Sequence, residues 1–373
     1  MKLVLSVDAL SPVLTGIGRY AWELSTIMPR QLGIENVDFY RQNRWIRDPG
    51  MLLCEPVPKE AFKRPKRFFG VKPPHWLNAY SQKKACHDKV FHGPNYFVPA
   101  CANRAVATVH DLSVFKFPDT HPVERIRHFE REFTASLSRV QHLITDSEAT
   151  RQEVLEFVSW SPDKITAIPL GVAPNFKPKP VADLVVILAK FGLDAGRYGL
   201  SVSTLEPRKK IDHLLSAYEL LPNSLRQIYP LVLVGGAGWL SDALHERIDR
   251  LSAQGWLRYL GFVAEDDLPF LYAGARAFFF PSIYEGFGLP VLEAMASGTP
   301  VVASNCSSLP EVTKGAALLV NPDDIDAFKI AIEQCLLDDV WREGAIDKGF
   351  EVAHTYSWSR CVSETIDVYK KIA

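Results

Sequence analysis

The strongest constraint on the fold of this chain is an alternation of short apolar runs with amphipathic helical patterns, which occurs in two consecutive series. The first series runs from KLVLSVD to KITAIPLGV, and the second runs from YGLSVSTLEP to RAFFFPS. Short apolar runs that end at a Gly, Pro or polar turn predict buried parallel strands, and the patterns between them predict covering helices. The sequence therefore predicts an α/β protein with two doubly wound, Rossmann-like domains that face a central cleft.

Chain length and proline content suggest where these domains meet. A chain of 373 residues is typical of two domains of ordinary size. Because the stretch 173–196 begins with several prolines, we interpret it as a linker. We expect an N-terminal domain over residues 1–175 and a C-terminal domain over residues 176–356. The amphipathic tail at about 357–373 is expected to form a helix that packs back onto the N-terminal domain.

The composition excludes several classes of protein. Hydrophobic residues make up 47% and charged residues 23%, as in globular proteins. The net charge of −1 argues against binding to nucleic acid. The six cysteines have no CxxC spacing, which favours reduced thiols in the cytoplasm over disulfides or a metal site. No apolar stretch approaches the ~20 residues that a membrane-spanning helix needs.

The stretch PSIYEGFGLPVLEAMASG places two glutamates around a predicted strand-to-helix turn. Gly286 to Leu289 should present backbone N–H groups at a helix N-terminus, where a phosphate binds readily. Glu285 and Glu293 flank this turn, and carboxylates accept hydrogen bonds from vicinal hydroxyls. The pattern predicts a phosphate between two polyols, as in a nucleotide sugar. The alternative is an ordinary helix entry with two solvated glutamates.

Three further turns also follow predicted strands. Arg208 and Lys209 could clamp a diphosphate and neutralise a leaving group, or they could belong to a solvated basic turn. Gly16 and Gly18 match GxGxxA, but ALSPVLT separates them from the preceding strand. We therefore interpret them as a glycine loop that closes over phosphate, with a flexible turn as the alternative. GGAG at 235–238 is interpreted as a close-packed turn.

Polar residues at the strand ends of the first series are candidates for contacts with a ligand. His110 and Asp111 end the run RAVATVHD, at the sheet edge where ligands bind in such folds. FHGPNY offers His92 and Tyr96 as candidate acceptor contacts, and Arg19 is a further candidate. Each isolated histidine is equally compatible with a buried structural role.

Residues 59–84 differ from the rest of the chain in composition. This segment has eight Lys or Arg residues against one Glu, with Phe62, Phe68, Phe69 and Trp76 interleaved. Such a composition is typical of attachment to an anionic membrane surface, and a solvated loop is the alternative. We therefore expect a cytoplasmic protein that attaches peripherally to the inner face of the plasma membrane.

Taken in order, these motifs resemble glycosyltransferase family 4, whose members have the GT-B fold. YEGFGLPVLEAMASGTPVVAS resembles the E-x7-E region, and SVSTLEPRKK, LVLVGG, YLGFV, DLPFLYAGA and SSLPEV resemble other second-domain motifs. TGIGRYAWEL, FHGPNYFVP, TVHDLSVFKFPDTH, ITDSEATRQEV and IPLGV resemble first-domain motifs, so the resemblance covers essentially the whole chain.

The resemblance implies roles for the matching residues. Glu293 would bind the donor ribose, Glu285 would contact the donor sugar, and His110 would touch the transferred sugar. The catalytic group would comprise His110, Arg208, Lys209 and Glu285. The residues that contact the donor would be Gly16, Gly18, Val263, Phe287, Gly288, Leu289 and Glu293. Arg208 and Lys209 would hold the diphosphate, so neither a metal nor a cofactor is expected.

The resemblance also implies an activity. We expect a retaining glycosyltransferase that moves a hexose onto a lipid-linked glycan in bacterial O-antigen or lipopolysaccharide synthesis. The expected donor is GDP-linked mannose or D-rhamnose, with a UDP-sugar as the alternative. An NAD-dependent oxidoreductase is disfavoured by the poor glycine fingerprints. A catalytically silent sugar-binding protein is disfavoured because Arg208, Lys209, Glu285 and Glu293 are all intact.

Overall fold

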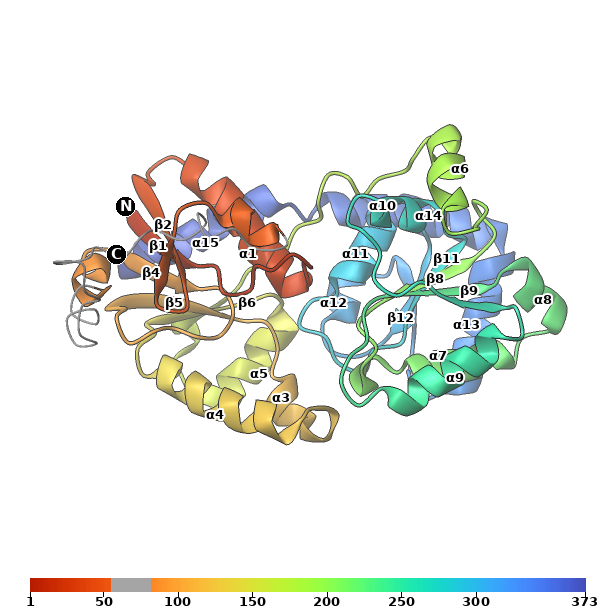
Figure 1. Cartoon of the computed structure of the whole chain (residues 1–373), viewed down its shortest axis with the longest axis horizontal. Coiled ribbons are helices and arrows are strands. Elements are labelled where there is room, and N and C mark those ends of the chain that lie inside the picture. The colour runs from red at the N-terminus through yellow and green to blue at the C-terminus, as the bar shows by residue number, and fades with distance from the viewer. Residues whose placement is uncertain (55–81) are drawn as a thin grey trace. The chain divides into compact units, whose positions relative to one another are not determined.

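The computed structural model describes residues 1–54 and 82–373, and these residues form two compact units (Figure 1). The first unit comprises Met1–Leu112, Arg127–Gly171 and Trp358–Ala373, and the second comprises Ser113–Ile126 and Val172–Ser357. Almost all of the basic, aromatic segment 59–84 lies outside the described residues.

The first unit is built on a seven-stranded sheet in the order β3-β2-β1-β4-β5-β6-β7. Its neighbouring strands are parallel except for β2 and β3, which are antiparallel. The strands are β1 (Lys2–Ser6), β2 (Asn36–Arg41), β3 (Arg44–Ile46), β4 (Val90–Gly93), β5 (Arg104–Val109), β6 (His142–Thr145) and β7 (Ile165–Ala167). The helices are α1 (Gly16–Ile27), α4 (Val123–Leu137, whose first turn belongs to the second unit), α5 (Glu148–Val158) and α15 (Trp358–Ile372). Short 3-10 helices are η1 (Met28–Arg30), η2 (Pro49–Leu53) and η5 (Pro162–Lys164).

The second unit is built on a six-stranded parallel sheet in the order β10-β9-β8-β11-β12-β13. The strands are β8 (Gly199–Val202), β9 (Leu231–Val234), β10 (Leu257–Tyr259), β11 (Ala277–Phe280), β12 (Val301–Ser304) and β13 (Ala317–Val320). The helices after the strands are α7 (Ile211–Glu219), α8 (Asn223–Ile228), α9 (Asp242–Ser252), α10 (Leu268–Gly274), α11 (Leu289–Ala296), α12 (Leu309–Thr313), α13 (Ile325–Leu337) and α14 (Asp339–His354). The unit also contains α3 (Ser113–Lys116), η4 (Pro118–Thr120), α6 (Val181–Ala189) and η6 (Pro207–Lys209).

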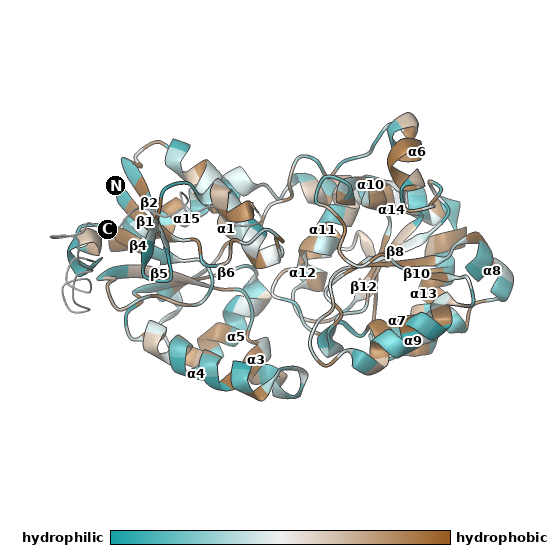
Figure 2. Ribbon diagram, viewed as in Figure 1, coloured by the Kyte–Doolittle hydropathy of each residue, from teal (hydrophilic) through white to brown (hydrophobic). Residues whose placement is uncertain are grey.

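The burial pattern of the strands explains these parallel sheets. Strands β4, β6, β9, β11 and β12 are buried at every position, as expected where helices cover both faces of a sheet. Figure 2 shows mostly hydrophobic strands in the second unit, with a polar outer face on α9. Two consecutive α/β units with mainly parallel sheets confirm the fold class that the sequence predicted.

Aromatic packing fixes the core beside β8. Trp256 stacks on Tyr218 with ring centroids 5.8 Å apart, and Tyr218 meets Phe279 edge-on at 5.9 Å. A Cβ atom on Gly199 would lie 2.4 Å from the ring of Phe279, so only glycine lets the aromatic side chains approach β8 this closely. The packing of β8 in turn sets the position of the basic turn that follows it.

The linker prediction for residues 173–196 is wrong over part of its length. Helix α6 occupies Val181–Ala189, directly after Pro180, which serves as its N-terminal cap. Leu184 and Leu188 lie one turn apart on this helix and are buried, and α6 packs on α10. Proline at a helix entrance does not oppose helix formation, and this explains why the proline-rich pattern was misleading.

The interpretation of Gly16 and Gly18 as a loop is also wrong. Both residues lie in the first turn of α1, where Thr15 caps the helix by accepting a hydrogen bond from the Gly18 N–H. A Cβ atom on Gly18 would lie 3.1 Å from the carbonyl oxygen of Ala9, so Gly18 permits close packing of the helix on the preceding segment. The turn at 235–238 is close-packed as predicted, because a Cβ on Gly235 would lie 2.0 Å from the Ser203 carbonyl oxygen.

We predict that Gly93→Ala destabilises the protein by ~1–3 kcal/mol. The reason is that a Cβ at Gly93 would lie 2.2 Å from the backbone oxygen of Phe97, which cannot rotate away. Chemical denaturation would measure the change. Gly344→Ala is the matched control, because Gly344 lies in α14 with open space around its Cβ. The control should be neutral or stabilising by up to ~1 kcal/mol, and equal losses in both variants would contradict the prediction.

Candidate functional site

The candidate site is formed by the segments that follow three neighbouring strands of the second unit. Strands β8, β11 and β12 are adjacent and parallel, so the segments that follow them start at the same edge of the sheet. These segments are η6 with Arg208 and Lys209, the turn 281–288 with Glu285, and the turn 305–308. Parallel α/β sheets bind ligands at this edge. The topology therefore joins residues that lie up to one hundred positions apart in the sequence.

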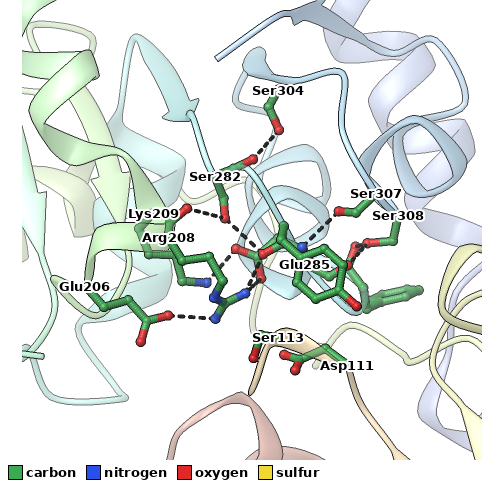
Figure 3. Close-up of polar contacts among 12 residues, drawn as sticks. Asp111, Ser113, Glu206, Arg208, Lys209, Ser282, Glu285, Ser304, Ser307 and Ser308 are labelled. Carbon is green, nitrogen blue, oxygen red and sulfur yellow. Dashed lines mark hydrogen bonds and ion pairs between the residues drawn. The ribbon is translucent and has the colours of Figure 1, made fainter. Parts of the chain in front are cut away.

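Glu285 is the centre of a cluster of charged side chains (Figure 3). The Lys209 Nζ lies 2.5 Å from Glu285 Oε1, and the Arg208 Nη1 lies 3.6 Å from Glu285 Oε2. Arg208 also donates through Nη2 to Glu206 Oε1 at 2.6 Å and through Nη1 to the backbone oxygen of Tyr284. The cluster therefore pairs two cations with two carboxylates, and Glu206 is only 4% exposed.

The cations determine the charge state of Glu285. Burial of the carboxyl group opposes its ionisation, but the charges of Lys209 and Arg208 outweigh burial and hold the pKa of Glu285 below its ordinary value. Glu285 is therefore a carboxylate at neutral pH and can accept hydrogen bonds from hydroxyl groups.

Serine side chains fix the turn that carries Glu285. The Ser307 hydroxyl accepts from the Glu285 N–H at 2.8 Å. The Ser308 hydroxyl lies within donating distance of two carbonyl oxygens, at 2.9 Å from Glu285 and 2.8 Å from Phe287. Ser304 donates to the carbonyl of Ser282, which ties the same turn to β12. These contacts hold the backbone on both sides of Glu285 in one arrangement.

The N-terminus of α11 has the backbone needed for anion binding. Gly288 caps the helix at φ 107°, a conformation that L side chains rarely adopt. A Cβ there would also lie 2.6 Å from Leu309 Cδ2. Among the described residues, no group accepts a hydrogen bond from the N–H of Phe287, Gly288 or Leu289. These three N–H groups at a helix N-terminus can receive a phosphate oxygen.

Glu293 and Val263 occupy other positions in the same unit. Glu293 lies within α11 and is half-buried beside α10. Burial raises the pKa of the Tyr272 phenol on α10, and the charge of Glu293 raises it further. Val263 follows β10 and is buried. Strand β10 is the edge strand beyond β9, so Val263 does not belong to the charged cluster.

In the first unit, both ring nitrogens of His110 have hydrogen-bond partners inside the protein. Its Nδ1 lies 2.6 Å from Asp146 Oδ2, and its Nε2 lies 2.7 Å from the carbonyl oxygen of Pro94. Contact between the ring nitrogens and a sugar would require one of these bonds to break.

The candidate acceptor residues differ in accessibility. His92 is buried, with its ring nitrogens 2.7 Å from the Tyr369 hydroxyl and 2.8 Å from the Thr108 hydroxyl. Burial lowers the pKa of His92 to about 3, so His92 is a neutral structural histidine. Tyr96 is buried, with Asp111 donating its N–H to the phenol oxygen, whereas Arg19 is partly exposed on α1.

Sequence reasoning missed Glu206, Asp146 and the supporting serines. Glu206 stands two positions before Arg208, and Asp146 directly follows β6. The rule that polar residues at the carboxyl ends of strands mark the site would have found Asp146. Ser307 and Ser308 belong to the motif SSLPEV, but the motif does not show their role, because a serine that supports a backbone turn has the same sequence pattern as a solvated one.

Comparison with known proteins identifies the family. A family model described as Glycosyl transferases group 1 matches residues 189–351. The O-antigen chain mannosyltransferase B of Escherichia coli is 38% identical over 379 residues, covering 99% of this chain and 100% of that protein. The chain belongs to the group 1 glycosyltransferases. The O-antigen chain mannosyltransferase RfbU of Salmonella typhimurium is 28% identical over 259 residues, covering 69% of this chain and 68% of that protein.

Solved structures show the fold of this glycosyltransferase. WaaG, described as a glycosyltransferase involved in lipopolysaccharide biosynthesis, has a TM-score of 0.70 at 15% identity, covering 99% of each chain. Anabaena HepE in complex with UDP and glucose has a TM-score of 0.73 at 17% identity, also covering 99% of each chain. The predicted GT-B fold is confirmed, and the chain is a glycosyltransferase by family.

The described part of the chain shows neither a metal-binding cluster nor a membrane-spanning helix. Residues 1–54 and 82–373 contain no group of three or more His, Cys, Asp or Glu side chains placed to share a metal ion. No helix in the described part of the chain combines the length and apolarity needed to cross a bilayer.

We predict that Ser308→Ala destabilises the glycosyltransferase by ~1–3 kcal/mol, because two buried carbonyl oxygens lose the single hydroxyl donor that they share. Urea denaturation of the variant and the parent would measure the loss. Ser138→Ala is the matched control, since the exposed Ser138 hydroxyl donates to the carbonyl of Ala135 one turn earlier. A Ser308 variant as stable as the Ser138 variant would contradict the role of Ser308.

Proposed function

We propose that this glycosyltransferase transfers a hexose, mannose or D-rhamnose, from a GDP-sugar with retention of configuration. The proposed acceptor is a lipid-linked glycan of a bacterial O-antigen or lipopolysaccharide. The observation that carries the proposal is the charged cluster around Glu285, in a chain that aligns end to end with a named O-antigen mannosyltransferase.

The charged cluster supports donor binding by simple electrostatics. We propose that Arg208 and Lys209 bind the diphosphate and stabilise its charge as it departs. The N-terminus of α11 adds three backbone N–H groups and the positive end of the helix dipole. We propose that neither a metal nor a cofactor is needed, with these groups supplying the positive charge for the leaving group. Gly16 and Gly18, at the start of α1, are proposed to approach the phosphates with their backbone.

Carboxylates flank the proposed phosphate position. We propose that Glu293 binds the ribose hydroxyls and that Glu285 binds the hydroxyls of the donor sugar. Glu285 suits this role because its neighbouring cations keep it ionised. Val263 is proposed to lie near the base. Arg19 and Asp111 are the proposed acceptor contacts, since both are accessible at the edge of the first unit.

The names of the relatives support mannose as the transferred sugar. Three of these relatives are the two O-antigen chain mannosyltransferases and the serotype-specific mannosyltransferase WbdA of Escherichia coli, which is 30% identical. The alignment with WbdA covers 75% of this chain and 36% of WbdA. A UDP-sugar is the alternative donor, because the structurally similar HepE was solved with UDP-glucose. The family assignment excludes the NAD-dependent oxidoreductase and disfavours the silent sugar-binding protein.

We also propose attachment to the cytoplasmic face of the plasma membrane through residues 59–84. Eight basic residues with interleaved aromatic side chains favour an anionic lipid surface. A lipid-linked acceptor would be presented at the same surface.

The proposed donor predicts which nucleotides stabilise the protein. In a thermal-unfolding series with GDP, UDP, ADP, GDP-mannose, UDP-glucose and NAD, we expect stabilisation by GDP and GDP-mannose. A ligand present at ~100 times its dissociation constant stabilises by about 2.7 kcal/mol, which is readily measured. Stabilisation by UDP ligands alone would indicate a UDP-sugar as the donor instead of a GDP-sugar. Stabilisation by NAD alone would overturn the proposed function.

Protein variants, measured for donor binding and for transfer, test the proposed roles of the site residues. Glu293→Ala should weaken the stabilisation by the donor, whereas Lys209→Ala should mainly slow transfer, by about 100- to 1,000-fold. Lys329→Ala is the matched control, because among the described residues Lys329 pairs only with Glu333 on α13. Wild-type binding and rate in both site variants would contradict the proposed site.

The membrane proposal predicts that replacing Lys63, Arg64, Lys66 and Arg67 by Gln reduces binding to anionic vesicles. Each basic residue near such a surface contributes about 1 kcal/mol. Co-sedimentation with phosphatidylglycerol vesicles would measure binding, with neutral phosphatidylcholine vesicles as the control. Unchanged sedimentation of the variant would identify the segment as a solvated loop.

A further inference from the structure

A buried histidine–carboxylate pair joins two strand ends of the first unit. His110 directly follows β5, Asp146 directly follows β6, and these strands are neighbours in the sheet (Figure 1). Their side chains are 7% and 4% exposed, and Nδ1 of His110 lies 2.6 Å from Oδ2 of Asp146. The comparisons and the family resemblance assign no role to Asp146.

The carbonyl oxygen of Pro94, which lies at Nε2 of His110, determines which ring nitrogens carry protons. A carbonyl oxygen only accepts hydrogen bonds, so the bond to Pro94 requires a proton on Nε2 of His110. The short contact on Nδ1 then shares a second proton with Asp146, either as imidazolium and carboxylate or as imidazole and carboxylic acid. Asp146 Oδ1 is buried and has no hydrogen-bond partner among the described residues, so an unshared carboxylate charge there would be costly.

The bond to Pro94 connects the turn after β4 to the turn after β5. Two more hydrogen bonds join the same segments, from the Tyr96 N–H to the Thr108 carbonyl and from the Asp111 N–H to the Tyr96 hydroxyl. Tyr96 holds a positive φ of 62°, which costs conformational energy for a bulky residue and needs such support. His110 is therefore one of two side chains that connect these turns at the ligand-binding edge of the sheet.

Helix α1 packs on the same ring. The Tyr20 ring meets the His110 ring edge-on, with centroids 5.3 Å apart, and the Tyr20 hydroxyl lies 3.0 Å from the Thr108 hydroxyl. Tyr20 is one residue beyond Arg19 and two beyond Gly18, so the His110 ring also supports the first turns of α1. The pair therefore links turns and helices that follow four adjacent strands, β1, β4, β5 and β6.

We propose that Asp146 is a positioning residue for the transfer reaction. By sharing a proton with His110, it keeps Nε2–H on the Pro94 carbonyl and holds the turns after β4 and β5 in one arrangement. His110 then acts on the arrangement of the two turns through this bond. The effect on the reaction rests on the proposed glycosyl transfer, whereas the proton-sharing pair is a property of the folded protein alone.

Charged and titratable groups around the pair set the sign of its pH dependence. Burial lowers the pKa of His110, but Asp146 outweighs burial and leaves the pKa raised, with Asp111 contributing in the same sense. Burial raises the pKa of Asp146. Tyr20 on α1 and Cys361 on α15 are uncharged at neutral pH because burial raises the pKa of both.

His92 on β4 is neutral as well. With a raised folded pKa, the pair keeps its shared proton to a higher pH than a free histidine does, and it loses the proton as the pH rises through that pKa. Transfer should therefore decline on the alkaline side in the wild-type enzyme.

The first test measures the protons without measuring activity. In full-length protein labelled with ¹⁵N-histidine, His110→Gln assigns the His110 signals. We expect Nε2 of His110 to carry a proton at pH 7 in the wild-type protein and Nδ1 to share one with Asp146. In Asp146→Asn, the signal of Nδ1 should move to that of a neutral imidazole nitrogen while Nε2 keeps its proton, because an amide can donate to a neutral imidazole. A wild-type Nε2 without a proton, or an Nδ1 signal that is unchanged in Asp146→Asn, would overturn the proposal.

The second test separates positioning from simple stability. Asp146→Ala leaves Nδ1 without a partner, and we expect its rate to fall about 10- to 100-fold, as small misplacements in active sites do. Asp146→Asn should restore most of the rate and lose the alkaline decline. Asp88→Asn is the matched control, since Asp88 is an exposed residue of the same unit that pairs with Lys2.

The outcomes of the rate measurement are decisive. Rescue by Asn with a flat alkaline profile supports a positioning role. A wild-type rate in Asp146→Ala, or the same alkaline decline in Asp146→Asn as in the parent, would refute it. If no transfer to any acceptor is found, the proposed function fails, and the histidine signals still decide whether the pair exists.

Discussion

Burying a carboxylate requires a positive partner, and in the second unit this requirement fixes the geometry of the candidate donor site. Glu285 is buried in the turn that follows a completely buried strand, where an unpaired charge would be strongly unfavourable. Lys209 and Arg208 supply the compensating charge, and Glu206 in turn orients Arg208. The turns after β8 and β11 are thus held together by electrostatics before any ligand arrives. A preorganised cluster of this kind needs little reorganisation when a diphosphate binds.

Much of this architecture could be predicted from the sequence, because the informative signals are local. The apolar run before Pro281 and the glycine-rich turn after it specify a strand, a turn and the start of α11, and the structure has all three. The same local rules failed at 173–196, where prolines preceded a helix instead of marking a linker. They failed again at Gly18, where close packing rather than a loop explains the glycine.

The partners of each side chain were much harder to predict, since they depend on which strands are neighbours. Nothing near Glu285 in the sequence indicates that Ser308 holds its turn, because this contact needs β11 and β12 side by side. The ring of His110 shows the same limit. A histidine at a strand end predicts a ligand contact equally well whether its nitrogens are free or, as here, bonded to Asp146 and Pro94.

The order of strands in the second sheet has a consequence for how donor specificity can change. The cluster around Glu285 draws on segments after β8, β11 and β12, which are adjacent in the sheet but separated by long stretches of chain. No contiguous stretch of sequence contains the site, so exchanging one turn between relatives would mix mismatched charges and supports. The specificity of the proposed donor site therefore depends on all three turns at this sheet edge. We expect substitutions in these turns to covary among relatives, because a change in one turn requires matching changes in the other two.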